Sequence, residues 1–380
     1  MRRMFVLLSL TLPLLVVLVG CQPPGAPTFA HLESQMGLAT GTELVSMSDA
    51  QVTAEFAGFH ALNAKWIRTL VSWNAIQGKG PGQENWHTLD RMEVAAHASG
   101  ISLILQPNNA PTWATTQDGN VACPSDGLAP YSFKAYAAFA AAVAAREPGS
   151  VLEMGNEPNL VQPGGWVAPS ACQYTQLLKE SYAAIKRANP TATVLSAGIG
   201  GTRGANGDIP GATFVAQMYA HGAKGSFDAL SYHPYSYPCL LSQTAFGTCP
   251  GGDPSGRGWP GLQNARNTMV ANGDAAKQIW LTEFGAPADG VAFTEASQAT
   301  ILTDGYEYWS SIPWAGPMMW FTYRDKVDHT SPHKGYLGLV TADYSVGGAG
   351  HAKLGWTAYS TLSHEPPSKL VPVPGGKSGH

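Results

Sequence analysis

The sequence predicts a single (β/α)8 barrel. From residue 29 onward, short apolar runs alternate with longer amphipathic segments, and eight such pairs fit within the 380 residues. This alternation and this length are typical of one parallel-stranded barrel. Hydrophobic residues make up 44% of the chain, which is enough for a large buried core. An open doubly wound sheet is the alternative, but the GxGxxG loop that usually follows its first strand is missing here.

The order of the elements follows from local signals. The expected strands are 33–39, 65–73, 101–107, 150–156, 192–200, 227–235, 278–285 and 316–323. The expected helices lie at about 49–63, 86–99, 131–147, 170–188, 211–222, 260–273, 294–311 and 351–363. They are clearest at 136–146 and 176–188, where helix formers recur with a period of 3.6 residues. The barrel should therefore span residues 29–365, followed by an extended tail at 366–380.

The N-terminus has the features of an export signal. A basic head precedes an apolar run from Phe5 to Val19, which is too short to span a membrane comfortably. The run ends in "LVGC", which resembles the lipobox of bacterial lipoproteins. This resemblance implies a signal peptide at 1–20, a lipidated Cys21 and a tether at 21–28. An ordinary cleaved signal and an uncleaved anchor are the alternatives.

Four further cysteines predict two disulfides. An even number of cysteines is typical of exported chains that form such bonds. Cys239 and Cys249 bracket a loop of Gly, Ser and Thr, so we expect them to pair, which leaves Cys123 with Cys172. Their spacing contains no CxxC element, so a zinc site is not expected.

The charge of the chain excludes some partners. The formal net charge is -4, and the sequence has no basic or acidic run. Neither nucleic acid nor an anionic membrane surface is therefore an expected partner. We expect a monomer that contacts the membrane only through its lipid anchor. The many aromatic residues are interpreted mainly as core, and the alternative is that some of them stack on sugar rings.

Two glutamates in "EMGNEPNL" stand out, because charged residues make up only 13% of the chain. Glu157 is expected at the C-terminal end of the fourth strand, where barrels carry their catalytic groups. Glu153 lies four residues earlier, and we place it on the same face of the same strand, deeper in the barrel. A buried carboxylate needs a partner. Arg68 on the second strand is a candidate partner for Glu153 or for a carboxylate nearer the lip.

A third glutamate occupies a similar place on the seventh strand. In "QIWLTEFG", we expect Ile279, Leu281 and Glu283 to share one inward face that ends in a carboxylate. Two glutamates across one barrel mouth suit the cleavage of a glycosidic bond. The alternative is a pair of solvated lip residues that form ion pairs.

"EMGNEPNL" together with "LTEFG" resembles the clan A glycoside hydrolases, which are retaining enzymes built on a (β/α)8 barrel. Within the clan the chain is most similar to family 39, with its xylosidase and exopolysaccharide-hydrolase relatives, whose fourth strand reads close to "FEVWNEPN". The resemblance covers nearly the whole mature chain in strand order. Gly155 departs from it, because the family usually has a bulky aromatic residue there. Either a neighbouring side chain fills that space or the pocket is wider.

The resemblance assigns roles to individual residues. It implies that Glu157 is the acid/base, that Glu283 is the nucleophile and that Asn156 binds the sugar 2-hydroxyl. "SYHPY" matches the His-x-Tyr pattern of the clan. Tyr235 would therefore contact the nucleophile, and His233 would line the pocket.

Three more residues complete the implied site. Arg68 would hold Glu283 ionised, because a nearby cation depresses the pKa of a carboxyl group. Trp320 in "MMWFTY" would form the floor for the sugar ring, and Trp113 in "PTWA" is a stacking candidate. For His233, Trp320 and Trp113, packing in the core is the alternative.

Other patterns carry less weight. Asp325, Asp328, His329 and His333 are close in sequence, but a polar rim loop is favoured over a metal site, and no metal or cofactor is expected. The glycine-rich "GIGGTRG" at 198–204 is interpreted as a flexible loop. No Gly-x-Ser-x-Gly element supports an esterase.

The sequence as a whole predicts an exported, retaining glycoside hydrolase that acts on a polysaccharide or oligosaccharide. One alternative is a non-catalytic carbohydrate-binding lipoprotein on a hydrolase barrel, although binding alone has no use for the glutamate pair. Another is a transglycosylase that uses the same residues.

Overall fold

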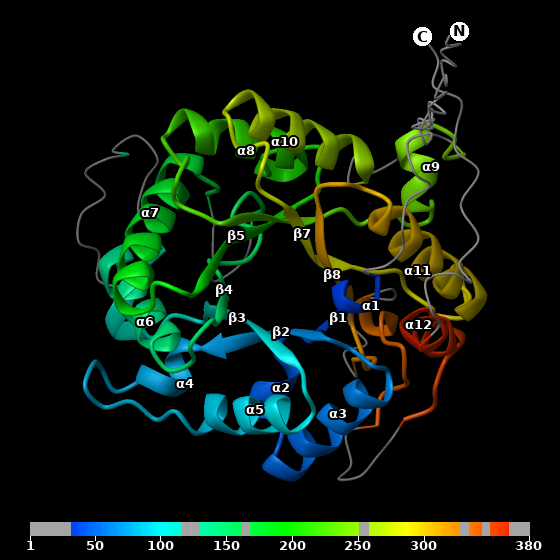
Figure 1. Cartoon of the computed structure of the whole chain (residues 1–380), viewed down its shortest axis with the longest axis horizontal. Coiled ribbons are helices and arrows are strands. Elements are labelled where there is room, and N and C mark those ends of the chain that lie inside the picture. The colour runs from blue at the N-terminus through cyan, green and yellow to red at the C-terminus, as the bar shows by residue number, and fades with distance from the viewer. Residues whose placement is uncertain are drawn as a thin grey trace, which may run out of the picture.

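The chain forms a closed parallel barrel, seen in a computed structural model that describes residues 32–115, 123, 130–161, 168–250, 258–326, 334–343 and 350–364. The strands are hydrogen-bonded in the order β1 to β8, and β8 pairs with β1. Figure 1 shows these strands at the centre with the helices around them. The predicted fold class is confirmed.

All eight predicted strands form. They are β1 Met36–Ala39, β2 Trp66–Ser72, β3 Ser102–Asn108, β4 Val151–Glu153, β5 Thr193–Gly200, β6 Ala229–His233, β7 Ile279–Phe284 and β8 Ala315–Phe321. The register is irregular in two neighbouring pairs of strands. In the β5–β6 pair it shifts between Leu195 and Gly198. In the β7–β8 pair it shifts between Ile279 and Leu281 and again between Leu281 and Phe284, a stretch that includes Glu283.

The eight predicted helices also form. They are α3 Asp49–Ala61, α5 His87–Ala98, α6 Phe133–Ala144, α7 Ala171–Ala188, α8 Gly211–Ala220, α10 Trp259–Ala271, α11 Glu295–Ser310 and α12 Leu354–His364. Four of these helices begin with a side chain that accepts a backbone N–H group of the first turn, which satisfies donors that a helix leaves free. The capping residues are Ser48 of α3, Ser132 of α6, Ser170 of α7 and Thr294 of α11.

Several short helices were not predicted, because one turn is too brief to show a period. They are α1 Leu32–Gln35, α2 Glu43–Ser46, α4 Trp73–Gln77, α9 Leu241–Phe246 and the 3-10 turns η1 Thr112–Thr115, η2 Ala205–Gly207 and η3 Lys334–Tyr336. Except for α1, they follow strands directly. They therefore belong to the loops at the C-terminal ends of the strands, where barrels carry their sites.

The barrel has a small inner core and a large outer one. Each strand gives an apolar side chain to the inner cluster, which includes Ile104, Val151, Trp280 and Met319. The alternate strand residues pack outward against the helices. The inner core fills the barrel interior, and Glu153 lies two residues beyond Val151 toward the C-terminal end of β4. Polar residues of the barrel interior therefore lie on the C-terminal side of the inner apolar core.

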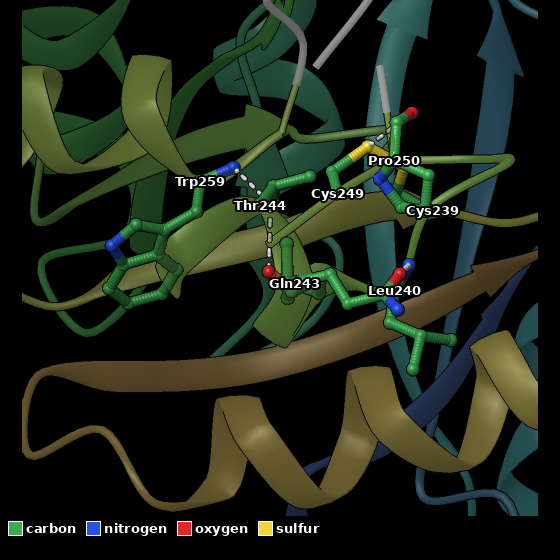
Figure 2. Close-up of a disulfide and its surroundings, with 8 residues drawn as sticks. Cys239, Leu240, Gln243, Thr244, Cys249, Pro250 and Trp259 are labelled. Carbon is green, nitrogen blue, oxygen red and sulfur yellow. Dashed lines mark hydrogen bonds between the residues drawn. A yellow bond between two sulfur atoms is a disulfide. The ribbon is translucent and has the colours of Figure 1, made fainter. Parts of the chain in front are cut away.

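Both predicted disulfides are present. Cys123 bonds to Cys172, which joins the segment after β3 to the start of α7. Cys239 bonds to Cys249 and closes the loop around α9 (Figure 2). The predicted export signal, Cys21, the predicted tether and the predicted tail at 366–380 lie outside the described residues. Within the described ranges, no helix has the length and apolar character needed to cross a bilayer.

Candidate active site

A cleft of about 740 Å³ opens at the C-terminal ends of the strands. Its lining includes Asn156 and Glu157 after β4, Tyr235 after β6, Glu283 on β7 and Phe321 on β8. Polar and aromatic groups therefore converge from strands that are far apart in the sequence. The structure brings both predicted catalytic glutamates into one cleft.

Arg68 on β2 connects the groups at the base of the cleft. Its Nε donates to Glu153 Oε2 at 2.6 Å, one terminal nitrogen donates to Glu283 Oε1 at 2.6 Å, and the other donates to Asn156 Oδ1 at 2.7 Å. Arg68 is 5% exposed and Glu153 is fully buried. The sequence left two possible partners for Arg68, namely Glu153 and a carboxylate nearer the barrel mouth. The guanidinium group binds both, and the second carboxylate is that of Glu283.

Glu283 accepts hydrogen bonds on both carboxylate oxygens. Arg68 binds Oε1, and the Tyr235 hydroxyl donates to Oε2 at 2.8 Å. Burial raises the pKa of Glu283, but the charges of His233 and Arg68 and the hydrogen bonds from Tyr235 and Arg68 outweigh it and hold that pKa below its ordinary value. Burial and the nearby carboxylates raise the pKa of Tyr235 well above its usual range, so it remains a donor. Glu283 is therefore ionised.

His233 at the end of β6 lies behind the two glutamates. Its Nδ1 is 3.1 Å from Glu157 Oε1, and its Nε2 is 3.0 Å from the Thr282 hydroxyl. Burial lowers the pKa of His233, but the charges of Glu283 and Glu157 outweigh that effect and raise it. His233 is 1% exposed and contacts Glu157 from the interior. Contrary to the prediction, His233 does not line the cleft, and it contacts Glu157 from behind as a positioning residue.

The two catalytic candidates are close together. One carboxylate oxygen of Glu157, one of Glu283 and a ring nitrogen of His233 all lie within 4.8 Å of one another. Three such ligand atoms could hold a metal ion. However, both Glu283 oxygens already accept hydrogen bonds from Arg68 and Tyr235. This arrangement favours a carboxylate that reacts with a substrate.

The backbone after β4 is irregular, contrary to the prediction that Glu153 and Glu157 share one strand face. Strand β4 ends at Glu153, Gly155 has a φ of +98° and Glu157 a φ of +42°. Residues that carry a Cβ atom rarely adopt a φ of this size, so the backbone conformation at position 155 favours glycine. The Ala197 methyl lies 3.7 Å from where a Cβ on Gly155 would be. Glycine therefore stands where an aromatic residue was expected because the chain changes direction at this position.

The glycines of β5 make room for the site. A Cβ on Gly198 would lie 2.0 Å from His233 Nε2, and one on Gly200 would lie 3.2 Å from Glu157 Oε1. Asn159 accepts from the Gly200 N–H and donates to the Gly200 carbonyl, which fixes the loop after β4 against β5. Gly198 and Gly200 are buried strand residues, so the first part of "GIGGTRG" is not the flexible loop expected from the sequence.

The predicted inward face of β7 is wrong. Ile279 and Leu281 pack in the outer core against the helices, and Trp280 fills the inner core. The register between β7 and β8 shifts between Leu281 and Phe284. Because of this shift, Thr282 contacts His233 while the next residue, Glu283, lines the cleft.

The predicted role of Trp320 does not fit its position. Trp320 is fully buried in the outer core, in edge contact with Phe284, and it does not line the cleft. Phe321, the next residue, packs against the inner core and lines the cleft. The physical reason is strand alternation, which places Met319 and Phe321 on the inner face and Trp320 on the outer face. Phe321 is the aromatic residue that β8 gives to the site.

Two other candidates also lie away from the cleft. Trp113 packs edge-on against Trp73 and donates to the Gln77 carbonyl at 2.6 Å, so it joins neighbouring loops and does not line the cleft. Asp325 accepts from Lys353 at 2.7 Å inside the protein, as a structural ion pair. Asp328, His329 and His333 lie outside the described residues.

Sequence reasoning missed Thr282, Gly198 and Phe321. No signal marks Gly198, because its role depends on the imidazole of a neighbouring strand. Phe321 could have been found from strand alternation if the inward phase of β8 had been known.

The Gly198→Ala variant tests how tightly β5 fits His233. We expect a loss of about 1–3 kcal/mol in the free energy of unfolding, because the new methyl group overpacks the imidazole. Urea unfolding of Gly198→Ala, His233→Ala and the double variant measures the coupling. In the His233→Ala background the added methyl has room, so its cost should be much smaller. If Gly198→Ala lowers the free energy of unfolding equally with and without the His233 imidazole, the contact between these two residues does not require glycine.

Solved structures of known proteins share the fold at low identity. A family 39 glycoside hydrolase from Bacteroides cellulosilyticus WH2 matches with a TM-score of 0.62 and 19% identity, over 87% of this chain and 63% of that chain. A monomeric beta-xylosidase from Caulobacter crescentus CB15 gives 0.62 and 18%, over 87% and 68%. A GH5_18 protein from Bifidobacterium longum subsp. infantis gives 0.60 and 16%, over 87% and 78%. The chain thus spans under two thirds of the first of these proteins.

A family model gives the more specific result. No curated protein matches the sequence. The model described as cellulase (glycosyl hydrolase family 5) matches residues 26–316, which is most of the chain. The predicted membership of clan A is confirmed, and the matching model is that of family 5, whereas the family 39 structures share the fold. The chain therefore belongs to the cellulase family, glycosyl hydrolase family 5.

Proposed function

We propose that the protein is an exported, retaining O-glycosyl hydrolase that cleaves a polysaccharide or oligosaccharide by double displacement. Glu283 is the nucleophile and Glu157 is the acid/base. The observation that carries this proposal is the spacing of the two carboxylates, with one oxygen of each within 4.8 Å of the other. Retaining enzymes hold these groups about 5–5.5 Å apart, whereas inverting enzymes need about 6.5–9.5 Å to admit a water molecule.

The environments of the two glutamates support different roles. Glu283 is held ionised by Arg68 and Tyr235, as a nucleophile must be. Glu157 is the more exposed of the two, with 21% of its side chain accessible against 13% for Glu283. Its Oε1 contacts His233 Nδ1 on the interior side, at 3.1 Å. Glu157 is thus placed to exchange protons with a leaving oxygen and with water.

The proposed reaction has two steps, the formation of a glycosyl ester on Glu283 and its hydrolysis by water. In the first, a Glu283 oxygen attacks the anomeric carbon while Glu157 gives its proton to the departing glycosidic oxygen. The aglycone leaves as an alcohol, and the sugar remains as an ester on Glu283. In the second, Glu157 takes a proton from water, whose oxygen displaces Glu283 from the anomeric carbon. Two inversions give net retention.

Asn156 is placed to bind the reacting sugar. Its Oδ1 accepts from Arg68 at 2.7 Å, which fixes the amide so that the Nδ2 group is the one left to donate. Asn156 lines the cleft next to Glu157. We propose that Nδ2 donates to the sugar 2-hydroxyl, a bond that strengthens in the transition state of such reactions.

We also propose that the protein acts outside the cytoplasm as a monomer, with a lipid on Cys21. Its two disulfides support export, because such bonds persist in oxidising compartments. Separation of membrane and soluble fractions from cells that make Cys21→Ala tests the anchor. Wild-type protein found only in the soluble fraction would contradict it.

Variants of the two glutamates test the catalytic assignment. Glu283→Gln should lower kcat/KM by about 10⁵–10⁶-fold, since only binding and orientation remain. Glu157→Ala should lose about 10²–10⁴-fold on substrates with poor leaving groups. It should regain activity with azide on activated aryl glycosides, because the anion replaces water in the second step. Glu180→Ala on helix α7 is the control.

Mass spectrometry after treatment with a 2-fluoro glycoside inactivator should find the label on Glu283. Full activity in Glu157→Ala, or a label on another residue, would overturn the assignment. No hydrolysis of any glycan by the wild-type protein would support the non-catalytic alternative.

The Tyr235→Phe variant tests how Glu283 stays ionised. Activity requires ionised Glu283, so it is lost as the pH falls through the pKa of that group. Loss of the Tyr235 hydrogen bond raises this pKa, and the acid limb of kcat/KM should move up by about 0.5–1 pH unit. Tyr182→Phe is the matched control, because Tyr182 donates to Asp228 away from the cleft. An acid limb that does not move would contradict the proposed role of Tyr235.

A further inference from the structure

A second tyrosine lines the cleft beside the catalytic groups. Tyr237 lies two residues beyond Tyr235 in the loop after β6, and both residues contribute to the cleft surface. Tyr235 is bound to Glu283. Tyr237 has no place in the two-step reaction, and its ring is only partly buried. An aromatic surface is therefore present next to the reacting position.

The ring of Tyr237 is held by two neighbours. Its centroid lies 6.2 Å from that of Tyr235, with an angle of 85° between the rings, and 5.6 Å from that of Phe293, with an angle of 86°. Edge contacts of this kind are favourable. Phe293 belongs to the loop after β7, where Asp289 Oδ1 accepts the N–H groups of Val291, Ala292 and Phe293, each at 2.9 Å. The orientation of Tyr237 is therefore set by two separate loops.

A disulfide fixes the loop just beyond Tyr237. Cys239 is bonded to Cys249, and the Cys239 N–H donates to the Ser236 carbonyl at 3.0 Å, which closes the chain around Tyr237. Figure 2 shows the Cys239–Cys249 disulfide. It also shows Thr244, whose hydroxyl accepts the backbone N–H of Trp259 at 3.1 Å. The N–H of Ser242 donates to Asp304 on α11 at 3.0 Å. The loop is thus anchored at several points away from the cleft.

We propose that Tyr237 forms a binding subsite for a sugar residue next to the one that reacts, and that the Cys239–Cys249 disulfide sets the position of that subsite. This inference rests on the proposed function and specifies its substrate as a chain of linked sugars. One face of a pyranose ring carries C–H bonds and packs on aromatic carbon. A ring already fixed in place loses little freedom on binding, so more of the contact energy appears as affinity.

The test is a chain-length series. Aryl β-glycosides and β-linked oligosaccharides of glucose and of xylose, with one to five sugars, are assayed with wild-type protein and Tyr237→Ala. We expect Tyr237→Ala to lose about tenfold in kcat/KM, mostly through KM, on the longer members, and nothing on the shortest member that the wild-type protein cleaves. Tyr237→Phe keeps the ring and should therefore keep the dependence of KM on chain length that Tyr237→Ala loses.

Two matched controls separate the subsite from general damage. Phe246 lies in the same disulfide loop, is 52% exposed and does not line the cleft, so Phe246→Ala should have no effect at any length. The Cys239→Ser/Cys249→Ser variant should weaken binding of the longer members only, whereas Cys123→Ser/Cys172→Ser should not. Thermal unfolding checks that each variant is folded.

The outcomes are distinguishable. An equal loss at every chain length in Tyr237→Ala would show a structural role and overturn the subsite. An unchanged KM in folded Cys239→Ser/Cys249→Ser would overturn the role of the disulfide. If the wild-type protein cleaves no member of the series, the proposed function fails on these glycans, and the subsite fails with it. If the wild-type protein cleaves the series and only the length dependence is absent, the subsite alone fails.

Discussion

The buried guanidinium group of Arg68 is the interaction on which the site depends. It donates to Glu153, Glu283 and Asn156, and so joins groups from β4 and β7 to β2. The planar fork of an arginine can satisfy three acceptors at fixed angles, which a lysine cannot do. Loss of one partner from a buried charge pair typically costs about 3–5 kcal/mol, so these groups hold one another in place. The low pKa of Glu283 is a consequence of this network.

The backbone of the barrel is irregular where the network requires it. A regular strand would place alternate residues inward, yet Thr282 and Glu283 both serve the site although they are consecutive. The register shift between β7 and β8 allows this. On β4, the left-handed conformations of Gly155 and Glu157 redirect the chain beyond Glu153. In both β7 and the segment after β4, the residues that line the cleft lie where the backbone departs from regular geometry.

Much of the fold could be predicted from the sequence. Each strand could be located as a short apolar run and each long helix as the longer segment that follows it, and the loop that Cys239 and Cys249 bracket pointed to their disulfide. The two glutamates could be placed at the barrel mouth because parallel strands end on the same side. These inferences depend on local pattern and on connectivity, which the sequence carries directly.

The side-chain directions could not be predicted as well. The inward face of β7 and the role of Trp320 were wrong for one reason, namely that the phase of a buried strand is hidden when both of its faces are apolar. The one-residue difference between Trp320 and Phe321 changes a core residue into a cleft residue. The need for glycine at Gly198 depends on His233 across the strand pair, and no local pattern encodes such a contact.

If Glu283 attacks the substrate and water then displaces it, the anomeric configuration must be retained. The most direct measurement is a time course of proton NMR spectra during hydrolysis of an aryl glycoside, read before the free sugar mutarotates. We expect the first sugar released to have the same anomeric configuration as the substrate. Release of the opposite anomer would contradict it, because a single displacement by water would then replace the two steps that the carboxylate spacing supports.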